Sequence, residues 1–121
     1  MAESHDLGKA GEDQAAEHLK KSGYRILKRN WTSGKNEIDI IAENKDFIVF
    51  VEVKTRTESL LIPVGDIVSR EKQKSIIQCA DKYIKWYNVP KECRFDVIIV
   101  IKTGDNYKID HIEDAFYPTL R

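Results

Sequence analysis

The sequence has little cysteine, little proline and no long apolar run. Its two cysteines, Cys79 and Cys93, lack the spacing of metal ligands, and we expect them to be reduced thiols rather than a disulfide. No internal repeat or low-complexity segment is present among the 121 residues. Apolar runs reach only five residues, as at 47–51, whereas a membrane-spanning helix needs about 18–20. These shortages favour a folded domain without a membrane segment.

A net charge is also missing. The chain has 20 Lys and Arg against 20 Asp and Glu, for a formal net charge of +0, which argues against a protein that coats nucleic acid indiscriminately. Residues 1–6 are polar and contain no apolar stretch of a secretory signal, so we expect a cytoplasmic protein. A hydrophobic fraction of 41% and a charged fraction of 33% fit one domain over residues 1–121, with 1–6 as a loose lead-in.

Hydrophobic periodicity predicts two helices and five strands. The helices are expected over residues 7–22 and 66–87. The strands are expected over residues 24–31 (or an extended arm), 37–42, 47–55, 94–101 and 107–112. Between them we expect a turn at 32–36, a hairpin loop at 43–46 and a mobile loop at 56–65. This order predicts a three-layer α/β/α domain in which helices flank a central mixed sheet.

The third predicted strand ends in the charged stretch Glu52-Val53-Lys54. Alternation along a strand puts Glu52 and Lys54 on one face and Val53 on the other. Charges that end so apolar a strand must be paired or bind a metal if they are buried. The alternative is a strand that leaves the core, with Glu52 and Lys54 in a local ion pair.

The neighbouring predicted strand carries Glu37 and Asp39, with Ile38 and Ile40 on its other face. Counting back around the hairpin loop places Asp39 near Glu52. Two carboxylates on adjacent strands repel each other unless a cation lies between them or one holds a proton. Mg²⁺ or Mn²⁺, which prefer oxygen ligands, would meet that need. The alternative is that Glu37 and Asp39 lie on the solvent face of a half-buried strand.

Two further polar side chains share helix faces with small or apolar residues. Glu12 lies on the face of Gly8 and Ala15 and could reach the acidic cluster. Alternatively it is an exposed carboxylate that the helix dipole favours near the helix start. Gln73 lies on the apolar stripe of the second helix. It could hydrogen-bond the scaffold or a metal-bound carboxylate, or it could be a boundary residue.

Basic residues gather in segments on either side of these acids, and Trp31 lies among the first of them. Such segments would grip backbone phosphates without reading bases. The alternative is that each is a solvated surface side chain. The candidates for binding nucleic acid are Lys28, Arg29, Lys35, Arg56, Arg70 and Lys72.

The remaining aromatic and imidazole side chains are assigned no role in the chemistry. His5, His18 and His111 are scattered along the chain, and we expect surface or boundary residues rather than ligands. Trp86 and Tyr87 close the second helix, and we expect both to pack.

Six stretches, in order along the chain, together resemble a known family. Glu on the first helix, Asp on one strand and Glu-X-Lys on the next resemble the restriction-endonuclease-like PD-(D/E)XK nuclease superfamily. The closer resemblance is to the YraN-like (UPF0102) family of small bacterial proteins, which is similar to Holliday junction resolvases. The stretches are GKAGE (8–12), GYRIL (23–27) with RN (29–30), EIDIIA (37–42), FVEVKTR (50–56), RFDV (94–97), and HI (111–112) with DAF (114–116).

The resemblance implies a mixed sheet flanked by helices and phosphodiester hydrolysis with Mg²⁺ or Mn²⁺. It implies that Asp39 and Glu52 are metal ligands. It also implies that Lys54 is the catalytic lysine and that Glu12 is an accessory acid.

Two functions remain open at this point. The first is a metal-dependent DNA endonuclease that is specific for structure, on branched or flapped DNA. The second is a non-catalytic module that binds nucleic acid or a partner protein and keeps the acidic cluster for folding. A homodimer that grips two duplexes, as junction resolvases do, would be an analogy only.

Overall fold

The computed structural model describes residues 2–57 and 68–118, and this part of the chain forms two helices and five strands in the predicted order. The helices are α1 (Ala2–Lys21) and α3 (Arg70–Tyr87). Neither is long and apolar enough to cross a membrane. The strands are β1 (Arg25–Ser33), β2 (Asn36–Glu43), β3 (Phe47–Arg56), β4 (Glu92–Thr103) and β5 (Asn106–Phe116).

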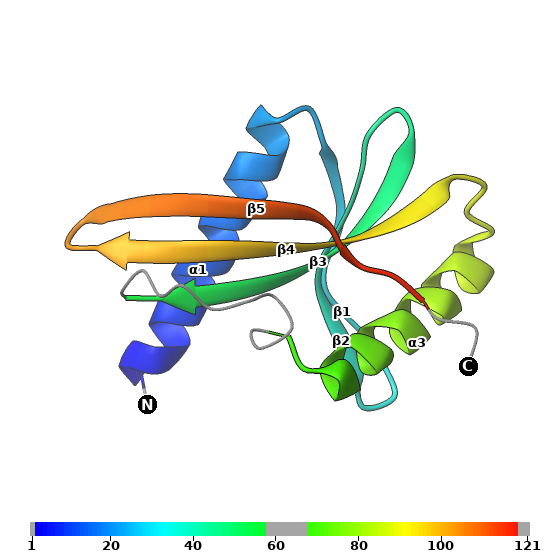
Figure 1. Ribbon diagram of the computed structural model, residues 1–121, viewed down its shortest axis with the longest axis horizontal. Coiled ribbons are helices and arrows are strands. Elements are labelled where there is room, and N and C mark those ends of the chain that lie inside the picture. The colour runs from blue at the N-terminus through cyan, green and yellow to red at the C-terminus, as the bar shows by residue number, and fades with distance from the viewer. Residues whose placement is uncertain (1, 58–67, 119–121) are drawn as a thin grey trace.

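The five strands form one mixed sheet in the order β1-β2-β3-β4-β5. β3 and β4 are parallel, and the other neighbours are antiparallel. The sheet is strongly twisted, so that β1 and β2 run across the direction of β4 and β5 in Figure 1. α1 packs on one face, and α3 packs on the other. The predicted three-layer α/β/α arrangement is therefore confirmed.

The apolar residues of the central strand β3 contribute to the core on both faces of the sheet. Val49 and Val51 join the cluster beneath α1, whereas Ile48 and Phe50 join the cluster beneath α3. All four side chains are at most 1% exposed. A strand buried on both faces needs apolar residues at every position rather than at alternate ones, and the stretch from Phe47 satisfies this requirement.

The helix starts differ from the predicted ones. α1 already begins at Ala2, so the prediction that residues 1–6 are a loose lead-in is wrong for residues 2–6. Ala and Glu are good helix formers, and they extend a helix without contributing an apolar face. α3 begins at Arg70 instead of residue 66, because the Ser69 hydroxyl accepts a hydrogen bond from the Lys72 amide and caps the helix. Most of the predicted loop at 56–65 lies outside the described residues.

The end of α3 also differs from the prediction. Its buried face is formed by Ile76, Cys79, Ala80 and Tyr83. Trp86 is 77% exposed and Tyr87 is 44% exposed, so the prediction that both pack is wrong for Trp86 and only partly right for Tyr87.

A network of polar side chains that the sequence did not reveal surrounds the buried carboxylate of Asp96. Arg94 donates to both carboxylate oxygens at 2.9 and 2.8 Å, and the Asp114 amide donates at 3.0 Å. His111 Nε2 lies 2.7 Å from Asp96, and its Nδ1 lies 3.0 Å from His18 Nε2 on α1. Burial opposes ionisation of Asp96, but the bonds from His111, Arg94 and Asp114 together hold its pKa below the ordinary value.

We predict that Asp96→Asn lowers the free energy of unfolding by about 3–5 kcal/mol. The substitution keeps the shape of the side chain but removes the buried counter-charge of the Arg94 guanidinium, and leaves it the exposed Glu113 carboxylate at 3.9 Å. Urea denaturation measures the change. Asp105→Asn, at an exposed turn position, is the control and should stay within about 0.5 kcal/mol of the parent protein. Equal stabilities of the two variants would contradict the prediction.

Candidate active site

β2 and β3 stop pairing at Asp39. The last paired residues are Ile40 and Val51, and at the next position the Asp39 carboxylate accepts a hydrogen bond from the Val53 amide at 2.8 Å. The β2 chain also changes face here, because Ile38 packs in the cluster beneath α3 and Ile40 in the cluster beneath α1. The prediction that these two isoleucines share a face is therefore wrong, since the strand leaves its regular alternation where it leaves β3.

A cleft of about 350 Å³ lies at this separation, between β2, β3 and α1. All four residues predicted to be catalytic line it, so the structure brings together side chains from three elements. The lining residues are Leu7, Gly8, Glu12, Asp39, Glu52, Val53, Lys54, Thr55 and Arg56.

Two of the residues that line the cleft, Glu52 and Lys54, carry opposite charges. Glu52 is only 4% exposed, so it does not sit on a strand that leaves the core. Lys54 Nζ lies 3.3 Å from Glu52 Oε2. The two side chains therefore share a face, as the alternation predicts, and they form an ion pair in the lining of the cleft.

The Asp39 carboxyl group is in an unfavourable place for a negative charge. Burial and the neighbouring charge of Glu52 raise its pKa to about 7, although the Val53 amide acts in the opposite direction. The charge of Glu12 and hydrogen bonding with Glu52 raise the pKa further. Near neutral pH, without a cation, the Asp39 carboxyl group therefore carries a proton for part of the time.

A close approach of α1 to β3 positions Glu12. A Cβ atom built on Gly11 would collide with the hydroxyl of Thr55, so only glycine fits this contact. This contact was not predicted, although a glycine inside a helical pattern is a signal for close packing. Glu12 itself lies 3.5 Å from Arg29 Nη2, which also contacts Asp13 at 2.8 Å.

Two predicted accessory residues lie outside the cleft. Glu37 is exposed and pairs with Thr32 near the turn between β1 and β2. Gln73 donates from Nε2 to the Val68 carbonyl oxygen at 2.9 Å. This is a hydrogen bond to the scaffold, one of the alternatives considered for Gln73 from the sequence. Neither residue lines the acidic cleft.

The predicted nucleic-acid-binding residues are spread over the surface. Only Arg56 lines the cleft, where its Nη1 donates to the Thr55 carbonyl oxygen at 2.9 Å. Arg29 is engaged with the α1 carboxylates. The others lie on β1, at the β1–β2 turn and on the first turn of α3, and they are Lys28, Lys35, Arg70 and Lys72.

The carboxylates of the cleft suit one particular way of binding a divalent cation. Among residues 2–57 and 68–118, no three His, Cys, Asp or Glu side chains gather closely enough to form a complete metal cage. Mg²⁺, however, keeps several waters and is commonly held by one or two carboxylates together with substrate phosphates. The Asp39 and Glu52 carboxylates, which repel each other, fit that mode of binding.

We predict that Gly11→Ala and Gly8→Ala change stability in opposite directions. Alanine at Gly8 meets nothing within 4 Å and should stabilise the helix by up to about 1 kcal/mol. At Gly11 the added methyl collides with Thr55, and overpacking of this kind costs about 1–3 kcal/mol. Thermal unfolding of both variants measures the difference. A Gly11→Ala protein as stable as Gly8→Ala would show that α1 does not approach β3 this closely.

We also predict a pH dependence of stability that belongs to Asp39. The folded protein holds this proton to about pH 7, whereas an unfolded aspartate releases it near 3.8. The folded state therefore binds more protons between these values, and this contribution to stability declines as pH rises from about 4 to about 7. Urea denaturation in a chelator, for the parent protein and for Asp39→Asn, measures it.

Asp39→Asn should remove this part of the pH slope, because the amide does not titrate. Asp46→Asn, at an exposed position in the β2–β3 turn, is the control and should keep the parent slope. The same slope in the parent protein and in Asp39→Asn would contradict the raised pKa.

Among solved structures, the chain is similar to a Holliday junction resolvase from Archaeoglobus fulgidus. The TM-score is 0.46 at 17% sequence identity, over 84% of this chain and 74% of the resolvase chain.

Close relatives are found by sequence. A UPF0102 protein of Bacteroides thetaiotaomicron is 44% identical over 99% of both chains, and one of Flavobacterium psychrophilum is 45% identical over 97% of this chain and 98% of its own. A third, from Parabacteroides distasonis, is 42% identical over 100% of both chains. The model of Uncharacterised protein family UPF0102 matches residues 11–100. The chain belongs to this family.

Proposed function

We propose that the protein is a metal-dependent endonuclease that hydrolyses phosphodiester bonds in branched or flapped DNA. The observation that carries the proposal is a pair of mutually repelling carboxylates, Asp39 and Glu52, in a cleft that also holds Lys54. This combination of two acids and a lysine is the one expected of the nuclease superfamily that the sequence resembles.

Asp39 and Glu52 would hold Mg²⁺ or Mn²⁺ in this cleft. A bound ion of this kind supplies an activated water at neutral pH and offsets negative charge on a phosphate. Lys54 would contribute a second positive charge, which favours the negative charge that develops on the phosphate during hydrolysis. Glu12 would be an accessory acid, since it lines the same cleft and its charge already acts on Asp39.

The basic side chains identified in the sequence would provide the phosphate contacts. Arg56 supports this assignment best, because it lines the cleft next to Lys54. Such contacts fix the position of a duplex without reading its bases, which agrees with recognition of DNA shape. The cytoplasmic location expected from the sequence is part of the same proposal.

One observation favours the alternative, a non-catalytic module that binds nucleic acid or a partner protein. Lys54 lies 3.3 Å from Glu52, and this ion pair offsets the buried charge without a metal. In that case the cluster would serve folding, and no divalent ion would bind to it.

We predict that the purified protein cleaves DNA with Mg²⁺ or Mn²⁺ and that Asp39→Ala and Lys54→Ala abolish cleavage. The first substitution removes a metal ligand, and the second removes the charge that stabilises the reacting phosphate. The measurement is a gel assay of single-stranded, duplex, flap and four-way junction DNA with Mn²⁺, against a metal-free reaction. Junction or flap substrates should be cut and the blunt duplex spared.

Asp46→Ala and Lys45→Ala are matched controls, because both residues are exposed in the β2–β3 turn at the opposite end of β3. They should cleave like the parent protein. A calorimetric titration with Mn²⁺ separates the two functions. Heat that is lost in Asp39→Ala supports the endonuclease, whereas a parent protein without binding heat or thermal shift supports the alternative. Unchanged cleavage in Asp39→Ala would discard the proposed mechanism.

A further inference from the structure

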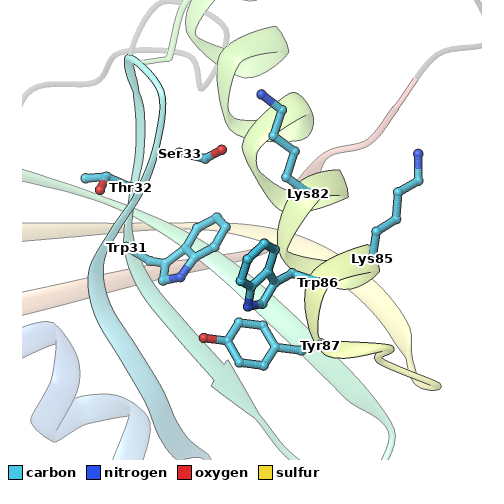
Figure 2. A pocket seen from close by; sticks show the side chains of 7 residues that line it. All are labelled: Trp31, Thr32, Ser33, Lys82, Lys85, Trp86 and Tyr87. Carbon is cyan, nitrogen blue, oxygen red and sulfur yellow. The ribbon is translucent and has the colours of Figure 1, made fainter.

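A second pocket of about 710 Å³ lies on the other side of the β1–β2 hairpin, between the end of β1 and the last turns of α3. It is separate from the acidic cleft and shares no lining residue with it. Figure 2 shows three aromatic rings gathered in it, with lysine side chains extending from α3 beside them. The lining residues are Trp31, Thr32, Ser33, Lys82, Lys85, Trp86 and Tyr87.

The aromatic rings differ in how firmly they are held. Trp31 packs edge-on against Tyr83, with ring centres 5.2 Å apart. Tyr87 lies 4.5 Å from Tyr83 between ring centres. Trp86 is 77% exposed, so most of its ring can accept a ligand. The pocket therefore combines two anchored rings with one open ring, which is the arrangement of a stacking platform.

The charge of the pocket is positive. Lys82 and Lys85 line it, and Lys28 Nζ lies 5.5 Å from the centre of the Tyr87 ring. Lys85 is paired with Asp81 at 2.9 Å, so Lys28 and Lys82 are the cations best placed for a ligand. No carboxylate is among the lining residues that the structure describes.

We propose that this pocket binds unpaired nucleotides of a single-stranded nucleic acid. The inference rests on the proposed function for the class of ligand, and it adds a site for the unpaired strand. Bases would stack on Trp86 and Tyr87, and phosphates would contact Lys28 and Lys82. Stacking on aromatic rings tolerates any base, because every base has a π-face, and it requires an unpaired strand.

The charge favours a nucleic acid over a proline-rich peptide, the other ligand that commonly docks on exposed tryptophan and tyrosine rings. A polyproline segment brings no negative charge to match Lys28 and Lys82, whereas a nucleic acid brings one at every nucleotide. The position of the pocket close to the acidic cleft also agrees with a nucleic-acid ligand, because Trp31 pairs with Ile38, the residue before Asp39. The pocket and the cleft are thus built on neighbouring positions of one hairpin, and a strand displaced from a flap could occupy the pocket.

The two tryptophans of the chain, Trp31 and Trp86, both line this pocket, so intrinsic fluorescence reports on it. We predict saturable quenching by a single-stranded oligothymidylate in metal-free buffer and much weaker quenching by a blunt duplex. In anisotropy titrations with a labelled oligothymidylate, Trp86→Ala should weaken binding about five- to a hundredfold. Trp86→Phe should restore part of the affinity. Lys82→Gln should make the plot of log affinity against log salt concentration less steep, by about 0.7 in its slope.

Tyr117→Ala is the matched control, because Tyr117 is 69% exposed and lies outside the pocket. It should bind like the parent protein, and circular dichroism should show that all variants are folded. Equal affinities of the parent protein and Trp86→Ala would overturn the proposal, as would quenching by a polyproline peptide and not by oligothymidylate.

The outcomes for the pocket and for the endonuclease are distinguishable. Binding of oligothymidylate by a parent protein that cuts none of the DNA substrates supports the pocket and rejects the endonuclease. Cleavage by the parent protein together with unaltered single-strand binding by Trp86→Ala rejects the pocket alone.

Discussion

The hydrogen bond from the Val53 amide to the Asp39 carboxylate is the contact on which the candidate site depends. In a regular antiparallel pair a backbone carbonyl oxygen would accept from this amide. Here a side chain takes that place, so the N–H group of the half-buried Val53 keeps a hydrogen-bond partner where β2 leaves β3. The same bond fixes the carboxylate beside Glu52. The end of the β2–β3 pairing and the placement of the Asp39 carboxylate beside Glu52 thus depend on the same hydrogen bond.

The carboxyl groups of Asp96 and Asp39 have surroundings that shift their pKa values in opposite directions. Around Asp96, the bonds from Arg94, His111 and a backbone amide lower the pKa, so the negative charge is already stabilised by the fold. At Asp39, burial and the charge of Glu52 raise the pKa, so the fold leaves the negative charge poorly stabilised. A group that becomes favourable only when a cation arrives is typical of a binding site, whereas a satisfied group is typical of a structural core.

How much of this could be predicted depended on whether the interaction was local. The proximity of Asp39 to Glu52 followed from a short hairpin loop and a period of two, because these fix the register of adjacent strands up to the last pair, Ile40 and Val51. The network around Asp96 joins α1, β4 and β5 through an irregular position at Asp114, which has a positive φ of 52°. No pattern in the sequence gives that pairing. The exposure of Trp86 was not predicted either, because the helical pattern does not show where the sheet that covers α3 ends.

The ion pairs also decide which basic side chains can attract a phosphate. Arg29 lies in a basic segment of the sequence, yet it contacts Glu12 and Asp13 and neutralises the carboxylates of α1. Its positive charge is therefore already offset by carboxylates of α1, which leaves less of it to attract a phosphate. In a chain without net charge, attraction must come from cations that are not consumed in this way. Among the residues that the structure describes, neither Arg56 at the cleft nor Lys28 at the aromatic pocket takes part in such an ion pair, so these two side chains meet that condition best.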